Sequence, residues 1–283
     1  KRGSKEARIQ RLQENGGTEK CEEAVVKALD WLQKTQNKDG SWDNSNKSAM
    51  TGIAVLAYLG HCETPLSEKY GDTVLRGLTF LINLGMANNG KLIQKGGEKD
   101  NSWVYEHGIS TYALAEATTF CKHLGVNVPN LQEVTQKAGQ YIIDNQHKSG
   151  GWDYAYDEAG DRGGDLSISA WHVQALKACH HTGLDFRNLR RSITKALDYV
   201  DARPEPSGGY GYQGTGPAGD TGYHTLTGAG MLCMQMWDKG SHSGVRNGAR
   251  YIEKNSRFDY NTSFCDLYGR SEERRVGKEC RSR

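Results

Sequence analysis

Residues 27–42, Lys-Ala-Leu-Asp-Trp-Leu-Gln-Lys-Thr-Gln-Asn-Lys-Asp-Gly-Ser-Trp, decide the fold of this chain of 283 residues. The stretch begins with apolar residues at helical spacing and ends in a Gly-Ser-Trp turn. Its opening recurs four times along the chain, with an aromatic residue at the fifth position each time, as RGLTFL at 76–81, KAGQYI at 137–142, KALDYV at 195–200 and NGARYI at 247–252. Recurrence at intervals of this size indicates a repeat protein.

Each repeat is predicted to be a helical hairpin, with a first helix, a Gly-rich turn and a second helix. The first helices carry a single apolar stripe, as Val25, Leu29 and Leu32 illustrate, and such helices lie at a surface. The second helices, expected at 107–121, 165–179 and 221–237, carry small residues on nearly every side. We therefore expect two layers of helices, although an open solenoid would give the same alternation as a closed ring.

The stretch 27–42 matches the QW repeat of triterpene cyclases at every defined position, including Gln36 and the Gly-x-Trp turn. A degraded copy at 137–152 keeps Gln146 and Trp152, and 207–212 keeps only the turn. The chain thus resembles the squalene–hopene cyclase/prenyltransferase-repeat family, a group of terpenoid cyclase-like proteins. The resemblance implies an all-α fold, an α/α toroid (barrel) of about five to six hairpins that is truncated at its C-terminal end.

Two further motifs narrow the resemblance. Tyr105-Glu106-His107-Gly108 and Gly164-Asp165-Leu166-Ser167, the latter followed by Trp171, are similar to openings of second helices in the repeat proteins of planctomycete-like bacteria. The biochemical role of those proteins is not established, so this resemblance predicts a fold and leaves the function open.

The chain divides into three predicted segments: an N-terminal extension at 1–21, an incomplete toroid at 22–269, and a foreign tail at 270–283. The tail, RSEERRVGKECRSR, resembles a translated sequencing adapter. Its six basic and three acidic residues change the formal charge of the remainder from +2 to −1. A chain so close to neutrality, with no basic stripe, is not expected to bind nucleic acid, and no apolar stretch is long enough to span a membrane.

The catalytic motifs of the related enzymes are absent from the sequence. It contains no Asp-x-Asp-Asp, the acid of triterpene cyclases, and no Asp-x-Cys, part of the zinc site of protein prenyltransferases. Asp161 and Asp165 are four residues apart across a Gly-Gly pair, a spacing that indicates a loop. We therefore expect neither a metal nor another cofactor, and whether the chain is an enzyme stays uncertain from the sequence.

A ligand site in such a barrel would lie where the second helices begin, because their free amides and dipoles make that end electropositive. The candidate acid/base residues there are Asp165, His107 and His224. The candidate ligand-binding residues are Tyr105, Glu106, Ser167, Trp171 and Tyr223. Helix capping is the alternative for Asp165, and a satisfied buried or a solvated imidazole is the alternative for the two histidines.

The favoured function is a binding or scaffold barrel whose partner is an apolar small molecule or a protein. The alternative is an enzyme of isomerase or transferase type that acts on an isoprenoid or other apolar ligand in the central cavity. The localisation is open, and an association with the bacterial cell envelope through sequence before Lys1 is one expectation. A catalytic site would bring Asp165, His107 and His224 together, whereas a scaffold would use them to hold helices.

Overall fold

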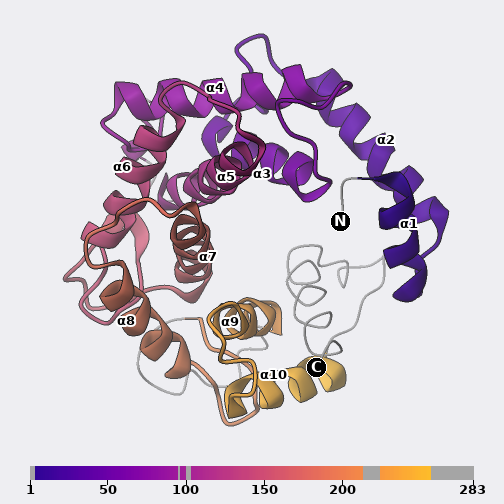
Figure 1. Cartoon of the computed structure of the whole chain (residues 1–283). Helices are drawn as coiled ribbons and strands as arrows, with labels where there is room; N and C mark the ends of the chain where they lie inside the picture. The colour runs from indigo at the N-terminus through magenta and orange to yellow at the C-terminus, as the bar shows by residue number, and fades with distance from the viewer. Residues whose placement is uncertain (1–3, 95, 100–102, 213–223, 256–283) are drawn as a thin grey trace. The chain divides into compact units, whose positions relative to one another are not determined.

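The computed structural model describes residues 4–94, 96–99, 103–212 and 224–255 (Figure 1). This part of the chain is helical and contains no strand, which confirms the all-α class. Two short 3-10 helices, η1 (Gly97–Lys99) and η2 (Tyr154–Tyr156), lie in loops. The α-helices are α1 (Lys5–Glu14), α2 (Glu19–Thr35), α3 (Lys47–Gly60), α4 (Gly71–Ala87), α5 (Trp103–Leu124), α6 (Leu131–Asp144), α7 (Leu166–Thr182), α8 (Leu189–Asp201), α9 (His224–Met236) and α10 (Ser243–Asn255).

The helices alternate along the chain as predicted. First helices are α2, α4, α6, α8 and α10, and second helices are α3, α5, α7 and α9. The boundaries come close to the predicted ones; α7, for instance, begins directly after Asp165. The predicted foreign tail, 270–283, lies outside the described residues.

The chain forms two compact units, which are described separately. Unit 1 comprises Lys1–Asp100, Tyr105–Gly139 and His181–Asp185, and unit 2 comprises Asn101–Val104, Gln140–His180 and Phe186–Arg283. The single toroid expected at 22–269 therefore stays a prediction.

The core of unit 1 lies between α2, α3, α4, α5 and the start of α6. Val55, Tyr58, Leu78 and Leu114 are fully buried in it, and the Tyr58 hydroxyl donates to the Leu29 carbonyl of α2. Helices α3 and α5 lie side by side, because a Cβ added at Gly52 would come within 3.2 Å of Ile109 and Ser110. The small residues of the second helices thus allow this close approach, as the sequence predicted.

The N-terminal helix α1 joins unit 1 through charge. It has no buried residue, but Arg8 donates to the buried carboxylate of Glu22 at 2.8 Å. His61 lies between two carboxylates, with Nε2 3.1 Å from Glu22 and Nδ1 2.9 Å from Glu63. Burial raises the pKa of Glu22, but the hydrogen bonds from Arg8 and His61 outweigh it and hold that pKa below its ordinary value.

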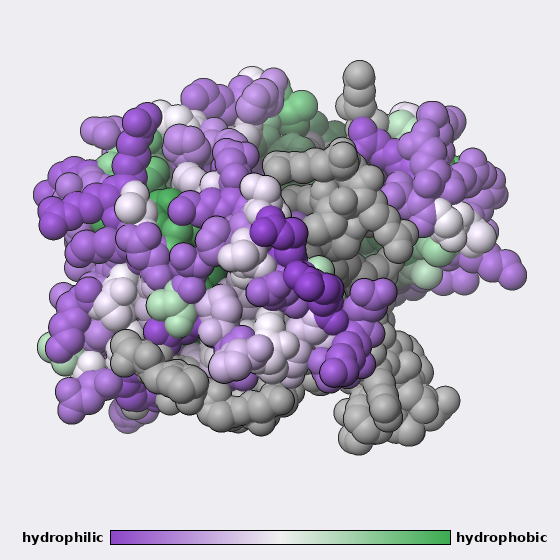
Figure 2. All heavy atoms as spheres, turned by 90° about the horizontal axis from the view of Figure 1, so that it is seen from below, coloured by the Kyte–Doolittle hydropathy of each residue, from purple (hydrophilic) through white to green (hydrophobic). Residues whose placement is uncertain are grey.

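The core of unit 2 is built by α7, α8, α9 and the turns between them. Trp152, Ile168, Val173 and Leu176 are fully buried, and Tyr210 is almost fully buried. In α9, every residue from Leu226 to Gln235 is buried, whereas α10 buries only one side. Figure 2 shows one face of the molecule, where most described residues are hydrophilic and the hydrophobic areas are small.

Candidate functional site

Four hairpins share one set of contacts, which we call the hairpin joint. Its first part is a turn glycine with positive φ, at which an added Cβ would lie 2.2 to 3.0 Å from the first residue of the next repeat motif. The closest approach is 2.2 Å, from Gly150 to the Lys195 carbonyl. The pairs are Gly40 with Arg76, Gly90 with Lys137, Gly150 with Lys195 and Gly208 with Asn247. Only glycine fits both the conformation and the space.

The second part of the joint holds the turn against the second helix of the same hairpin. The residue two positions after the glycine donates its backbone N–H to a buried side chain near the start of that helix. The acceptor is a hydroxyl in three hairpins and an imidazole in one. The pairs are Trp42 with Thr51 (3.1 Å), Leu92 with His107 (3.0 Å), Trp152 with Ser169 (2.9 Å) and Tyr210 with Thr227 (3.1 Å).

The Gln and Trp of the QW motif complete two of the joints. Gln36 donates to the carbonyls of Gly40 and Thr73, and Gln146 donates to those of Gly150 and Ser192. The indole N–H groups of Trp42 and Trp152 donate to the Leu32 and Ile142 carbonyls near the ends of their first helices. The Trp indoles thus bond the end of their own first helix, whereas the Gln side chains bond the turn and the following first helix.

His107 is fully buried and its two ring nitrogens are both engaged. Nδ1 accepts the Leu92 N–H, so the proton lies on Nε2, which donates to the Ala138 carbonyl at 3.1 Å. The imidazole is therefore in one tautomer, and neither nitrogen is left to take a proton from a ligand. His107 has the role that Thr51, Ser169 and Thr227 have in the other joints.

The two candidate histidines, His107 and His224, do not occupy equivalent positions in their hairpins. The residue of α9 that corresponds to His107 is Thr227, because both accept the turn amide of their hairpin. His224 is the first residue of α9, three positions earlier, and its side chain lies outside the described part. Tyr223, a predicted ligand-binding residue, lies there too.

Asp165 is fully buried at the start of α7. One carboxylate oxygen accepts from the Ser167 backbone N–H at 2.8 Å and from the Ser167 hydroxyl, and also from the Ile168 N–H. The other oxygen lies 3.3 Å from Arg162, whose guanidinium also reaches the buried Asp153 at 3.4 Å. Asp165 is therefore a helix cap with a cationic partner.

The other predicted ligand-binding residues are spread over both units. Glu106 accepts from the Ser48 N–H at 3.2 Å, which joins α5 to α3 within unit 1. Tyr105 and Trp171 are half-buried, and Ser167 belongs to the cap of Asp165. Because His107 is in unit 1 and Asp165 is in unit 2, the convergence of the candidate acid/base residues stays a prediction.

Unit 2 contains a buried Tyr–His pair that the sequence did not predict. His172 Nδ1 is 2.9 Å from the Ile168 carbonyl and carries the proton, so Nε2 accepts from the Tyr156 hydroxyl at 2.6 Å. The imidazole stacks on Trp152, and the Tyr156 ring meets Trp103 edge-on. Burial lowers the pKa of His172 to about 4, against the opposing effect of the Ile168 carbonyl, so the ring is neutral near pH 7.

No sequence pattern announces this pair. Tyr156 reaches His172 because Ala155 and Tyr156 both adopt positive φ, of 55° and 52°, in a loop with no glycine at those positions. Non-glycine residues enter that region at a cost, and only tertiary contacts hold them there.

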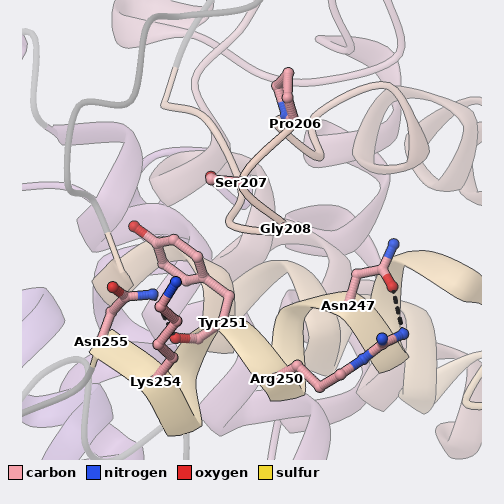
Figure 3. Close-up of a pocket in the computed structure, with 8 residues that line it drawn as sticks. All are labelled: Pro206, Ser207, Gly208, Asn247, Arg250, Tyr251, Lys254 and Asn255. Carbon is pink, nitrogen blue, oxygen red and sulfur yellow. Dashed lines mark hydrogen bonds between the residues drawn. The ribbon is translucent and has the colours of Figure 1, made fainter.

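A cavity of about 430 Å³ lies between the turn at 206–208 and α10 (Figure 3). Arg250 and Lys254 reach it from α10, and Arg250 donates to Asn247. In the preceding hairpin, the chain at Gly164 covers the corresponding face of α8. A Cβ added at Gly164 would lie 3.2 Å from the ring of Tyr199 in α8. We assign no ligand to this cavity.

No group of three or more His, Cys, Asp or Glu side chains is arranged to hold a metal ion among the described residues. In the same part of the chain no helix is both long and apolar enough to cross a membrane. Comparison of the sequence with the models of known protein families and with curated proteins finds no match.

Proposed function

We propose that this chain is a binding or scaffold protein of the α/α-toroid type and that it is not a terpene cyclase. The observation that carries the proposal is the engagement of the candidate catalytic side chains by the backbone. His107 uses one nitrogen for the Leu92 amide and the other for the Ala138 carbonyl. Asp165 uses one oxygen to cap α7 and turns the other to Arg162.

Such contacts are unfavourable for general acid/base catalysis. A general base needs a free lone pair within hydrogen-bond reach of the proton that it removes. A cyclase acid must be free to give its proton to the substrate, whereas one Asp165 oxygen accepts two backbone N–H groups and the other lies 3.3 Å from Arg162. In this proposal the second-helix starts build the hairpins, and binding uses the remaining surface.

The toroid is part of the same proposal. It is supported by the recurrence of the hairpin joint from Gly40 to Gly208, because equal joints between successive hairpins produce a steady curvature. Small-angle X-ray scattering tests it. A compact closed form of this length has a radius of gyration of about 19 Å. A clearly larger value with an elongated distance distribution would favour an open solenoid.

Activity and binding assays test the function. We expect squalene and prenyl diphosphates to be recovered unchanged after incubation with the purified chain, and some apolar ligand or protein partner to raise its melting temperature. Asp165→Asn should lower the melting temperature. Like the native chain, it should leave squalene and the prenyl diphosphates unchanged. A cyclised or transferred product formed by the native chain and lost in both Asp165→Asn and His107→Asn would overturn the proposal in favour of an enzyme.

A further inference from the structure

The junction between the end of α6 and the start of α8, within unit 2, forms an open cavity of about 320 Å³. Seven residues line it: Ile143, Asp144, Gln146, Asn188, Arg191, Ser192 and Lys195. The four from α8 and its cap are spaced three or four apart and thus form one face of its first two turns. The cavity lies where the helix dipole is positive, and the side chain of the N-cap residue Asn188 makes no capping hydrogen bond to α8.

A buried donor in this cavity lacks a partner. Ser192 is 2% exposed, and its hydroxyl has no hydrogen-bond partner among the described residues. The same position of α4 is Thr73, because Gln36 bonds the Thr73 carbonyl as Gln146 bonds that of Ser192. A buried hydroxyl without a partner is costly, so the position indicates a ligand or a bound water.

The equivalent junction in unit 1 shows why this one is open. There, Gln33 of α2 donates to the Thr73 hydroxyl at 3.2 Å and to the Lys69 carbonyl at 3.0 Å. In unit 2 the residue in the place of Gln33, three positions before the motif Gln, is Ile143. Since the Ile143 side chain has no polar group, it cannot donate to the Ser192 hydroxyl as Gln33 donates to that of Thr73.

The charges around the cavity favour an anion. Arg191 and Lys195 are exposed at its rim, and neither forms an ion pair with another described residue. Asp144 is the one acidic residue of the lining, and it is already engaged by Gln140 at 2.7 Å and Arg187 at 3.4 Å. Two unpaired cations, a positive helix end and a free hydroxyl are the donors that bind a tetrahedral oxyanion elsewhere in proteins.

We propose that this junction binds a phosphate group, held by Arg191, Lys195 and the Ser192 hydroxyl at the first turns of α8. The volume suits a phosphate or a small phosphorylated head group, and the site is independent of whether the protein is a scaffold or an enzyme.

The test is a titration of the full ¹⁵N-labelled chain with sodium phosphate at constant ionic strength, followed by transverse-relaxation-optimised NMR. Saturable shifts confined to amides of 143–146 and 188–195 are expected. Arg191→Ala with Lys195→Ala should weaken binding by about tenfold or more. Shifts of equal midpoint on the basic face of α10, at Arg246 and Arg250, would overturn the proposal by revealing only general attraction.

Ile143→Gln is the sharper variant, because it restores the unit 1 arrangement and removes no basic residue. It should plug the cavity, satisfy Ser192 and abolish phosphate binding at unchanged or higher melting temperature. Ser192→Ala serves as the second variant and should weaken binding by about fivefold. Unchanged phosphate binding in folded Ile143→Gln would overturn the site.

Two sources of the phosphate group can be separated. Sedimentation with phosphatidic acid vesicles, compared with phosphatidylcholine vesicles, tests a lipid head group. Cosedimentation that Ile143→Gln abolishes assigns the site to lipid phosphate. NMR binding without cosedimentation assigns it to a soluble phosphate, and absence of both contradicts the proposal.

Discussion

The hairpins α4–α5 and α6–α7 each bury a histidine, and they use it in different ways. In α4–α5, His107 is part of the hairpin joint and binds two backbone groups, the Leu92 amide and the Ala138 carbonyl. In α6–α7, Ser169 takes that role, and His172, one turn later, accepts from Tyr156 instead. The backbone requirement of the joint is constant, and the side chain that meets it is replaceable.

The glycine is the part that both hairpins share, and changing it should have the largest effect. Gly150→Ala would place a Cβ 2.2 Å from the Lys195 carbonyl at a φ of 99°. Gly90→Ala would collide with Lys137 in the same way. We expect each to lower the free energy of unfolding by about 4 kcal/mol or more, from strain and collision together.

Urea unfolding measures these changes, with Gly125→Ala as the control. Gly125 also has positive φ, of 67°, but nothing lies within 4 Å of an added Cβ, so only about 1 kcal/mol should be lost. Equal losses at Gly90, Gly125 and Gly150 would mean that the close approach contributes nothing.

Replacing His107 tests the part in which the hairpins differ. His107→Ala leaves the buried Leu92 N–H and Ala138 carbonyl without partners and should cost about 3 to 4 kcal/mol. His107→Asn should recover part of the loss, because its side-chain oxygen can accept from Leu92. If Asn is no better than Ala in chemical unfolding, the Leu92 contact does not stabilise the joint.

His172 should make the α6–α7 hairpin sensitive to acid. Its pKa is about 4 in the fold and about 6.5 when unfolded, so the unfolded chain binds more protons between these values. The stability that the neutral ring provides is present above pH 6.5 and is lost as the pH falls to 4, by about 3 kcal/mol at most. Urea midpoints at pH 7 and pH 4.5 measure it.

His172→Gln is the matched control, since Gln can still accept from Tyr156 and does not titrate. The difference between the native chain and this variant removes the contribution of carboxylates such as Glu22, whose lowered pKa also makes acid destabilising. Parallel pH profiles for the two proteins would contradict the role given to His172.

The motif Gln should have the smallest effect. Gln146→Ala removes two hydrogen bonds to carbonyls that water can reach in part, and should cost about 1 kcal/mol. The α4–α5 hairpin has Met86 at this position, while Asn88 bonds the Leu84 and Ile93 carbonyls instead. Asn88→Ala should therefore lower the free energy of unfolding by a similar amount, as urea unfolding can measure. A negligible change would mean that Asn88 does not replace the motif Gln in this hairpin.

The sequence predicted the fold better than the site. Hydrophobic spacing and the QW letters located the helices and the turns at Trp42 and Trp152, because those signals are local. For His107 the structure bears out the alternative of a satisfied buried imidazole. Its part in the hairpin joint was missed, because the loops between turn and second helix differ in length and hide the correspondence with Thr51 and Thr227. The Tyr156–His172 pair was missed because it depends on a loop conformation that no residue type announces.

The hairpin joint also affects how such repeats can be counted. The residue after the turn takes part in each joint through its backbone N–H, so Trp42, Leu92, Trp152 and Tyr210 can occupy one position without disturbing the geometry. A search for Gln and Trp letters would detect two of these four copies. A search for a glycine followed at a variable interval by a buried hydrogen-bond acceptor would detect all four, and would follow the architecture through greater sequence divergence.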